Sequence, residues 1–194
     1  MQLESKILNG LERLSEVLKA LLWEKAKIHG ISPIQIQILL FVSNHSVDLC
    51  NVSYLAKEFS ITKATVSDAV KVLLKKQFLE KDFSPTDKRR YNLLITKEGE
   101  VLVGDLAAYS LPLFDAFAEF SQEEKIHLFE TLSKLIFQLH QKGIIEVQRT
   151  CYNCQNYQGN KIDQHFCILL DQPLQNVNLR LDCPEFEEKT IQEI

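Results

Sequence analysis

Apolar and polar positions alternate with a helical period from the start of the chain. Five apolar positions recur at spacings of four, three, four and three, namely Ile7, Leu11, Leu14, Leu18 and Leu21. This spacing predicts a long helix over residues 3–29 with one apolar seam. Such a seam serves either packing within the chain or contact with a second subunit.

Three shorter helices are predicted to follow. In "SPIQIQILLFV", Ser32 can cap a helix, Pro33 suits its first turn, and Gln35 completes a capping box. "VSYLAKEF" predicts a short helix capped by Ser53. "SIT" is a tight turn, after which Thr62 can cap a further helix.

This further helix, "TKATVSDAVKVLLKK", has one apolar and one polar face. The apolar residues recur at i, i+3, i+4, i+7 and i+8, which are Val66, Ala69, Val70, Leu73 and Leu74. The opposite face carries short hydroxyls and long amines. Its candidate contact residues are Lys63, Thr65, Ser67, Lys71 and Lys75.

A β-hairpin is predicted next, because "FLEKDF" and "RYNLLIT" flank the turn sequence "SPTDKR". Its tip concentrates positive charge on Lys88, Arg89 and Arg90. Thr96 then caps a helix that Pro112 breaks or kinks. A last helix begins after Ser121 and ends near residue 143. Trp23 and the phenylalanines are assigned to core positions.

Composition places the chain among soluble globular proteins. It has 194 residues, 45% of them hydrophobic, and a formal net charge of -4. No apolar run approaches the roughly 20 residues of a membrane span, and the first residues lack the pattern of a signal peptide. The expected location is therefore the cytoplasm, with no membrane partner.

Charge is unevenly distributed along the chain. Residues 62–90 contain eight basic and four acidic residues, whereas residues 151–194 contain three basic and seven acidic ones. A narrow polar helix face followed by a cationic hairpin fits the grooves and phosphates of double-stranded DNA. The order of helices and hairpin thus predicts a winged helix-turn-helix, a DNA-binding fold that is mainly α with a small β-hairpin wing.

The hairpin sequence "DKRRYNLLIT" resembles the wing signature of the MarR family of bacterial regulators. The matching positions are Asp87, Arg89, Ile95, Thr96 and Gly99. "SPIQIQIL" and "SYLAKEF…TKATVSDAVKVLLKK" are similar to the second, third and recognition helices of that family.

The resemblance covers about residues 3–143 and implies a homodimeric transcriptional regulator, more often a repressor, on a pseudo-palindromic operator. It also implies that Arg89 enters the minor groove, that Asp87 orients the wing, and that a small-molecule effector binds. Two residues depart from the family pattern. Gln77 stands where glycine is common, and Asp68 is an acid on the outer helix face, where it either accepts from a cytosine amino group or pairs with a lysine.

The last quarter of the chain carries four cysteines in the spacing C-x2-C-x12-C-x15-C, which are Cys151, Cys154, Cys167 and Cys183. Four thiolates complete a tetrahedral structural zinc site. An iron–sulfur cluster is the alternative, because it also takes four cysteines and Cys183-Pro184 resembles a ferredoxin motif. His165 is either a substitute ligand or a surface residue, and unliganded thiols are the remaining alternative. Cys50 is interpreted as a buried small hydrophobe.

No nucleophile elbow, phosphate loop or carboxylate pair occurs, so the chain is not expected to be an enzyme. The tail alternatively forms a redox sensor or a docking module for another protein. The expected organisation is a dimerisation helix at 1–31, a winged helix-turn-helix at 32–96 and dimerisation helices at 97–143. A connector and a small metal-bound appendage follow at 144–194.

Overall fold

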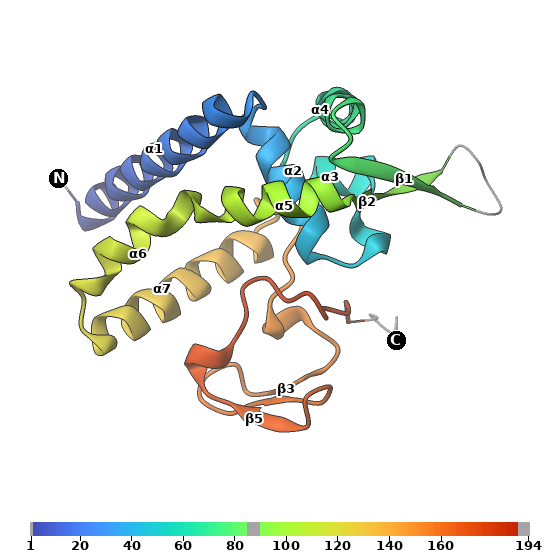
Figure 1. The fold of residues 1–194 in the computed structure, drawn as a ribbon. Coiled ribbons are helices and arrows are strands. Elements are labelled where there is room, and N and C mark those ends of the chain that lie inside the picture. The colour runs from blue at the N-terminus through green and yellow to red at the C-terminus, as the bar shows by residue number, and fades with distance from the viewer. Residues whose placement is uncertain (1, 85–89, 190–194) are drawn as a thin grey trace. The chain divides into compact units, whose positions relative to one another are not determined.

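The computed structural model describes residues 2–84 and 90–189, and these residues are mainly helical with a small hairpin, as predicted (Figure 1). The chain divides into two compact units, one up to Ala116 and one from Phe117 onward. The helices that begin in the first unit are α1 (Leu3–His29), α2 (Pro33–Asn44), α3 (Val52–Glu58), α4 (Lys63–Lys75), α5 (Lys97–Leu106) and α6 (Leu111–Ala118). Its strands and 3-10 turns are β1 (Leu79–Phe83), β2 (Tyr91–Ile95), η1 (Val47–Leu49) and η2 (Ala107–Ser110).

The ends of α1 and α2 follow the sequence signals. Gly30 ends α1 with a left-handed φ of 59°, a conformation that glycine adopts without steric penalty. The capping box of α2 is present, because the Ser32 hydroxyl accepts from the Gln35 amide and the Gln35 side chain accepts from the Ser32 amide. Both predicted helix boundaries are confirmed.

The predicted cap of α3 is wrong. Asn51, rather than Ser53, caps this helix, because its side-chain oxygen accepts a hydrogen bond of 3.0 Å from the Tyr54 amide. Asparagine is as good an N-cap residue as serine. Ser53 therefore lies inside the first turn and is exposed.

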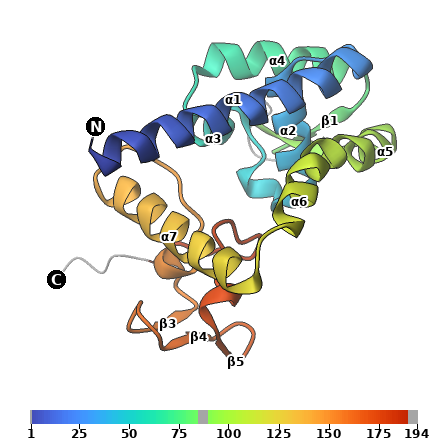
Figure 2. The same ribbon diagram turned by 90° about the vertical axis from the view of Figure 1, so that its left-hand side faces the viewer.

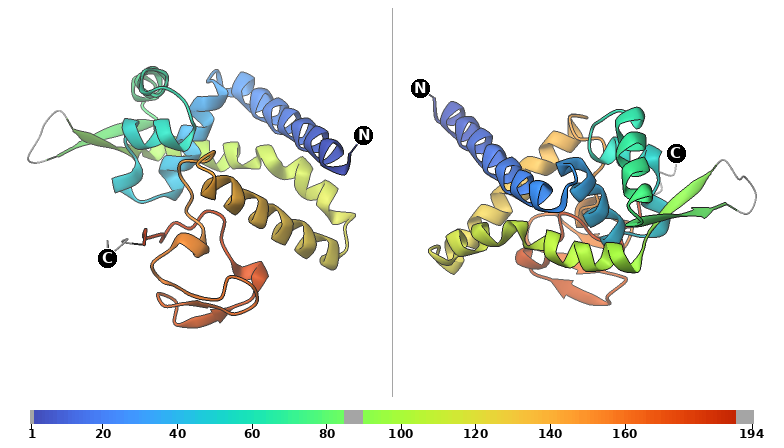
Figure 3. Two further views of the ribbon diagram at one scale, coloured as in Figure 1. Left: turned by 180° about the vertical axis from the view of Figure 1, so that it is seen from behind. Right: turned by 45° about the horizontal axis from the view of Figure 1, so that its top comes forward.

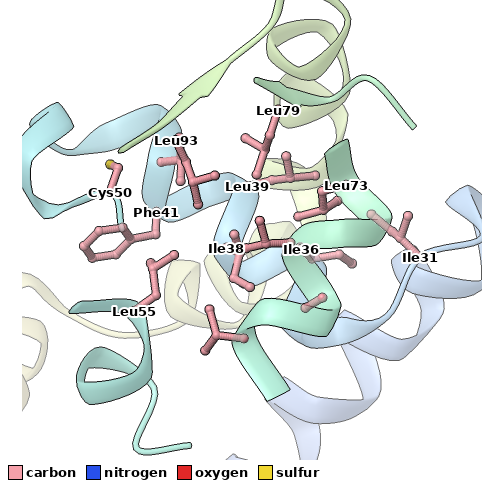
Figure 4. Packing of buried hydrophobic residues seen from close by; sticks show 14 of the residues in the cluster. Ile31, Ile36, Ile38, Leu39, Phe41, Cys50, Leu55, Leu73, Leu79 and Leu93 are labelled. Atoms are coloured by element: carbon pink, nitrogen blue, oxygen red, sulfur yellow. The ribbon is translucent and has the colours of Figure 1, made fainter. Parts of the chain in front are cut away.

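The apolar face of α4 packs into the core of the first unit (Figure 4). Four of its five predicted inner residues are buried, and Leu74 is half-buried at the edge of the core. Fully buried side chains from α2 and from the hairpin meet them there, including Ile36, Leu39 and Leu93. The opposite face of α4 consequently points to solvent.

The end of α4 has a glutamine at a position where glycine is common in the family that the hairpin sequence resembles. Gln77 has φ 61°, so it adopts the left-handed conformation that ends many helices. The Gln77 amide donates to the Leu74 carbonyl at 3.0 Å, and the Phe78 amide donates to the Leu73 carbonyl at 3.0 Å. The Thr96 hydroxyl also donates to the Gln77 carbonyl, at 2.6 Å. The turn therefore keeps the geometry of a glycine-terminated helix despite its side chain.

The hairpin β1–β2 is antiparallel and starts from the core. Leu79 and Leu93 are buried at its base, and the Leu93 amide donates to the Cys50 carbonyl at 2.7 Å. Farther out, Phe83 pairs with Tyr91 across the strands, with their ring centroids 5.8 Å apart. These contacts direct the hairpin outward beside α4 (Figure 3).

Gly99 lies at a close approach between α5 and the hairpin base. A Cβ atom added there would collide with the Phe78 carbonyl oxygen. Only glycine therefore allows this contact, while the Thr96 hydroxyl caps α5 by accepting from the Gly99 amide at 3.0 Å. Both residues belong to the wing signature.

The helical run Lys97–Ala118 is interrupted at η2, just before Pro112, as the proline predicts. By length and composition alone this run could cross a membrane, so the expectation that no apolar run approaches a span was wrong here. One such helix is weak evidence, and this one is tied to α1. Asp105 accepts from Lys25 at 3.0 Å and lies 2.7 Å from His29, and these two partners lower the pKa of its carboxyl group.

The second unit consists of a long helix and a small three-stranded sheet (Figure 2). Ser121 caps the helix with a capping box to Glu124. The strands are antiparallel, in the order β3-β4-β5. The elements are α7 (Gln122–Gln141), η3 (Cys151–Asn153), β3 (Tyr157–Gly159), β4 (His165–Cys167), β5 (Gln172–Leu174) and η4 (Asn176–Asn178).

Candidate nucleic-acid interface and cysteine cavity

The outer face of α4 presents the residue types expected from the sequence. Lys63, Thr65, Lys71 and Lys75 are exposed, and Ser67 is half-buried. Thr62 caps the helix by accepting from the Thr65 amide at 3.1 Å, so the N-terminal end of this face is fixed. This face is narrow and polar because the buried apolar side chains of α4 lie on the opposite side of the helix.

Asp68 pairs with a lysine, one of the two roles considered for it. Its carboxylate accepts from the Lys71 ammonium group at 2.9 Å, and their side chains are 74% and 71% exposed. The hydrogen bond to Asp68 raises the pKa of Lys71. An exposed pair of this kind is weak in water, so Lys71 can leave it for a stronger anion.

A wide groove of about 870 Å³ lies between α3, α4 and the hairpin. Asn51 and Ser53 line it at the start of α3, and Ser67 lines it from α4. On the hairpin, Asn92 of β2 and Arg90, the residue before β2, complete the lining. Sequence periodicity did not identify the two α3 residues as part of this surface. The polar residues after η1 were the available signal, but Ser53 was interpreted only as a helix cap and Asn51 was given no role.

The tip of the predicted wing lies only partly within the described residues. Asp87, Lys88 and Arg89 fall outside them, whereas Arg90 is exposed beside the groove. On β1, the Lys81 ammonium group lies 4.0 Å from the centroid of the Tyr91 ring, a cation–π contact. This contact holds one cation of the hairpin in place.

The described part of this surface can therefore present several amines and hydroxyls to a polyanion. Amines neutralise phosphate charge, whereas short hydroxyls and amides approach base edges. The helix face is thin enough for a major groove, and the hairpin can reach the neighbouring backbone.

All four cysteines of the tail line one small cavity, which we call the cysteine cavity. Its volume is about 40 Å³, and it lies in the second unit between η3, β4 and the segment after η4. Each of these cysteines has a free thiol. Apolar side chains, including Phe166, Leu170 and Leu174, and polar side chains, including Asn156 and Arg180, form the rest of the wall.

Several polar groups of the wall reach the cysteine sulfur atoms. The Arg180 amide donates to Cys151 Sγ at 3.2 Å, and the Arg180 guanidinium group lies 3.6 Å from Cys183 Sγ. Burial raises the pKa of the Cys151 and Cys183 thiols, while the contacts with Arg180 act in the opposite direction. Because a bound metal needs thiolates, hydrogen bonds from Arg180 would favour binding.

Two further observations describe what the cysteine cavity could hold. Among the residues that the structure describes, no group of three or more His, Cys, Asp or Glu side chains is arranged to hold a metal ion. In the cavity wall, the side-chain nitrogen of Asn156 is fully buried and has no hydrogen-bond partner. The sequence alone did not indicate a role for Asn156 or Arg180, because neither belongs to a recognisable pattern of metal ligands.

His165 is neither a surface residue nor part of the cavity wall. It is 5% exposed, and its two ring nitrogens lie 2.7 Å from the Tyr157 hydroxyl and 2.7 Å from the Asn176 side-chain oxygen. Asn176 in turn donates to Glu130 of α7 at 2.6 Å. Both ring nitrogens are therefore occupied, and His165 links the small sheet to α7.

Cys50 is a core residue. It is 1% exposed, and burial raises the pKa of its thiol to about 11. The thiol therefore stays protonated and unreactive at neutral pH, as its interpretation as a small hydrophobe predicts.

Comparisons with known proteins show which family model and which solved structures this chain is similar to. Residues 29–90 match the model of the MarR family, and no curated protein matches the chain. A MarR protein from Peptoclostridium difficile has the same fold with a TM-score of 0.62 and 25% identity, over 73% of this chain and 92% of that one. A MarR transcriptional regulator from Methanosarcina mazei has a TM-score of 0.60 and 19% identity, over 71% and 98%.

The S. aureus MepR–DNA complex also has this fold, with a TM-score of 0.58 and 23% identity, over 66% of this chain and 95% of that one. These three chains match over at least 92% of their own lengths. The family model thus covers about a third of the chain, and the solved structures show that the chain has the winged-helix fold of MarR proteins.

Proposed function

We propose that the chain is a sequence-specific DNA-binding regulator, with a repressor as the expected type. The observation that carries this proposal is the exposed polar face of α4 beside the groove and the hairpin. Lys63, Thr65 and Ser67 approach base edges, and Lys71 and Lys75 approach phosphates. Lys88, Arg89 and Arg90 extend the contact at the wing, and Asp87 orients it, as the family resemblance implies. A protein acting on DNA is expected in the cytoplasm.

A homodimer is part of the proposal. Large apolar side chains are exposed on α1 and α6, among them Leu3, Trp23 and Phe114, although Trp23 was expected in the core. Many large exposed apolar side chains on two helices are unusual on a monomer and typical of a subunit interface. Two copies would place two α4 helices in successive major grooves of a pseudo-palindrome. A small-molecule effector is proposed from the family resemblance only.

We also propose that the tail binds a metal group through Cys151, Cys154, Cys167 and Cys183. Their convergence on one cavity supports this role, because the sequence separates them by up to 15 residues. Structural zinc and an iron–sulfur cluster both use four thiolates. Bound metal would add folding energy to a unit whose own apolar core is small.

Selection of bound fragments from host genomic DNA, followed by hydroxyl-radical footprinting, tests the regulatory proposal. We expect one pseudo-palindromic sequence, protected in two regions about 10 base pairs apart, because two recognition helices of a dimer are one helical turn apart. Retention of fragments without a shared sequence would contradict sequence-specific binding. A single protected region would contradict the dimer.

A further inference from the structure

The cysteine cavity is larger than one ion needs. It has a volume of about 40 Å³, whereas roughly 10–15 Å³ is enough for a single water-sized group. In a four-cysteine zinc site, each sulfur lies about 2.3 Å from the ion, which leaves no space between the ligands. The four cysteines here surround a space instead of converging on a point.

The arrangement of the thiols agrees with the size of the cavity. All four cysteines line the wall of this one cavity, so their thiols share a single space. In a [4Fe–4S] cluster each cysteine binds a different iron atom, so the cysteine sulfurs lie farther apart than they do around one zinc ion.

The wall also offers hydrogen-bond donors for sulfur atoms. The buried Asn156 side-chain nitrogen has no partner, and an unpaired buried donor is costly. The Arg180 amide and guanidinium groups already contact two cysteine sulfurs. Inorganic sulfide and thiolate sulfur accept such bonds, which tune the potential of iron–sulfur clusters.

Part of the wall is apolar. Phe166, Leu170 and Leu174 provide apolar contacts around the sulfur atoms. Burial in apolar surroundings is one of the factors that set the stability and potential of an iron–sulfur cluster.

We propose that the cysteine cavity holds an iron–sulfur cluster on Cys151, Cys154, Cys167 and Cys183, with Asn156 as a hydrogen-bond donor to its sulfur. This inference rests on the proposed metal-binding role of the tail and is independent of DNA binding. It chooses between the two four-thiolate groups that the sequence left open. The cluster consists of iron and inorganic sulfide, which the cell must supply.

The direct test is anaerobic purification of the full chain, followed by measurement of iron, acid-labile sulfide and zinc, and by a visible spectrum. We expect a brown protein with iron and sulfide in comparable amounts and little zinc. Colourless protein with one zinc per chain would overturn the cluster but keep a metal-binding tail. Protein without any metal, even after anaerobic incubation with ferrous iron and sulfide, would overturn both.

Two variants make the test specific. Cys167→Ser should lose most of the bound iron, whereas Cys50→Ser, a change of the same chemistry in the first unit, should keep it. Equal loss of iron in both variants would contradict a site at the cavity.

Asn156→Leu keeps the size of the side chain but removes its donor. The cluster should then be reduced at a more negative potential, because the donor favours the reduced, more negative form. Gln158→Leu on the exposed side of β3 is the control. An unchanged potential in Asn156→Leu would remove this residue from the proposal.

Discussion

Replacing Lys71 with glutamate is expected to lower the affinity for operator DNA on the order of 100-fold in a dimer that carries the change twice. The ammonium group of Lys71 is exposed on the outer face of α4, and the proposal places it near a phosphate. The glutamate removes that contact and adds a repulsion. Titration in a gel-shift assay at fixed salt measures the loss.

Lys19→Glu is a closely matched control. Lys19 pairs with Glu16 at 2.9 Å, three residues away on an exposed helix face, with side chains 60% and 67% exposed. Lys71 pairs with Asp68 at the same distance and spacing. Both variants lose an equivalent ion pair and change the net charge equally, so they separate a local role of Lys71 from a general effect of charge. Equal affinities in the two variants would remove the α4 face from the interface.

Leu73→Ala should lower the free energy of unfolding by about 2–5 kcal/mol, because it deletes a fully buried side chain and leaves a cavity in the core. Leu73 lies on the inner face of α4 and anchors this helix to the core (Figure 4). Urea denaturation followed by circular dichroism gives the value. DNA affinity should fall as well at temperatures where the variant is partly unfolded.

The neighbouring Val72→Ala is the control, because Val72 is 39% exposed on the same helix. Its effect should stay within about 0.5 kcal/mol. Similar losses of stability for Val72→Ala and Leu73→Ala would mean that α4 does not present the face described.

The helices were largely predictable because their signals are local. Thr62, Thr96 and Ser121 cap the helices that their positions predict. Two residues that can cap α3, Asn51 and Ser53, lie two positions apart. The apolar periodicity of the helix does not determine which of them is the cap. The hydropathy of Lys97–Ala118 was underestimated because Pro112 and four acidic residues interrupt the apolar run.

The small sheet of the tail was not predicted. Its strands have three residues each, too few to show an alternating pattern. Their stability depends on contacts between distant residues, such as those of His165 with Tyr157 and Asn176. The sequence therefore pointed to the candidate ligands but not to the fold around them.

Each candidate site also has a part that the sequence predicted and a part that it did not. The outer face of α4 follows from the helical period alone. The α3 side of the groove and the donors Asn156 and Arg180 depend on how separate segments pack, which no spacing encodes. The cysteine set was visible because the four residues share one chemistry.

The salt dependence of affinity for the selected operator tests the central claim most directly. If lysines and arginines of α4 and the wing displace counterions from phosphates, raising the salt from 50 to 200 mM should weaken binding about 10³-fold or more. The logarithm of the binding constant should fall linearly with the logarithm of the salt concentration. Binding that stays constant over this range would contradict a DNA interface built from these cations.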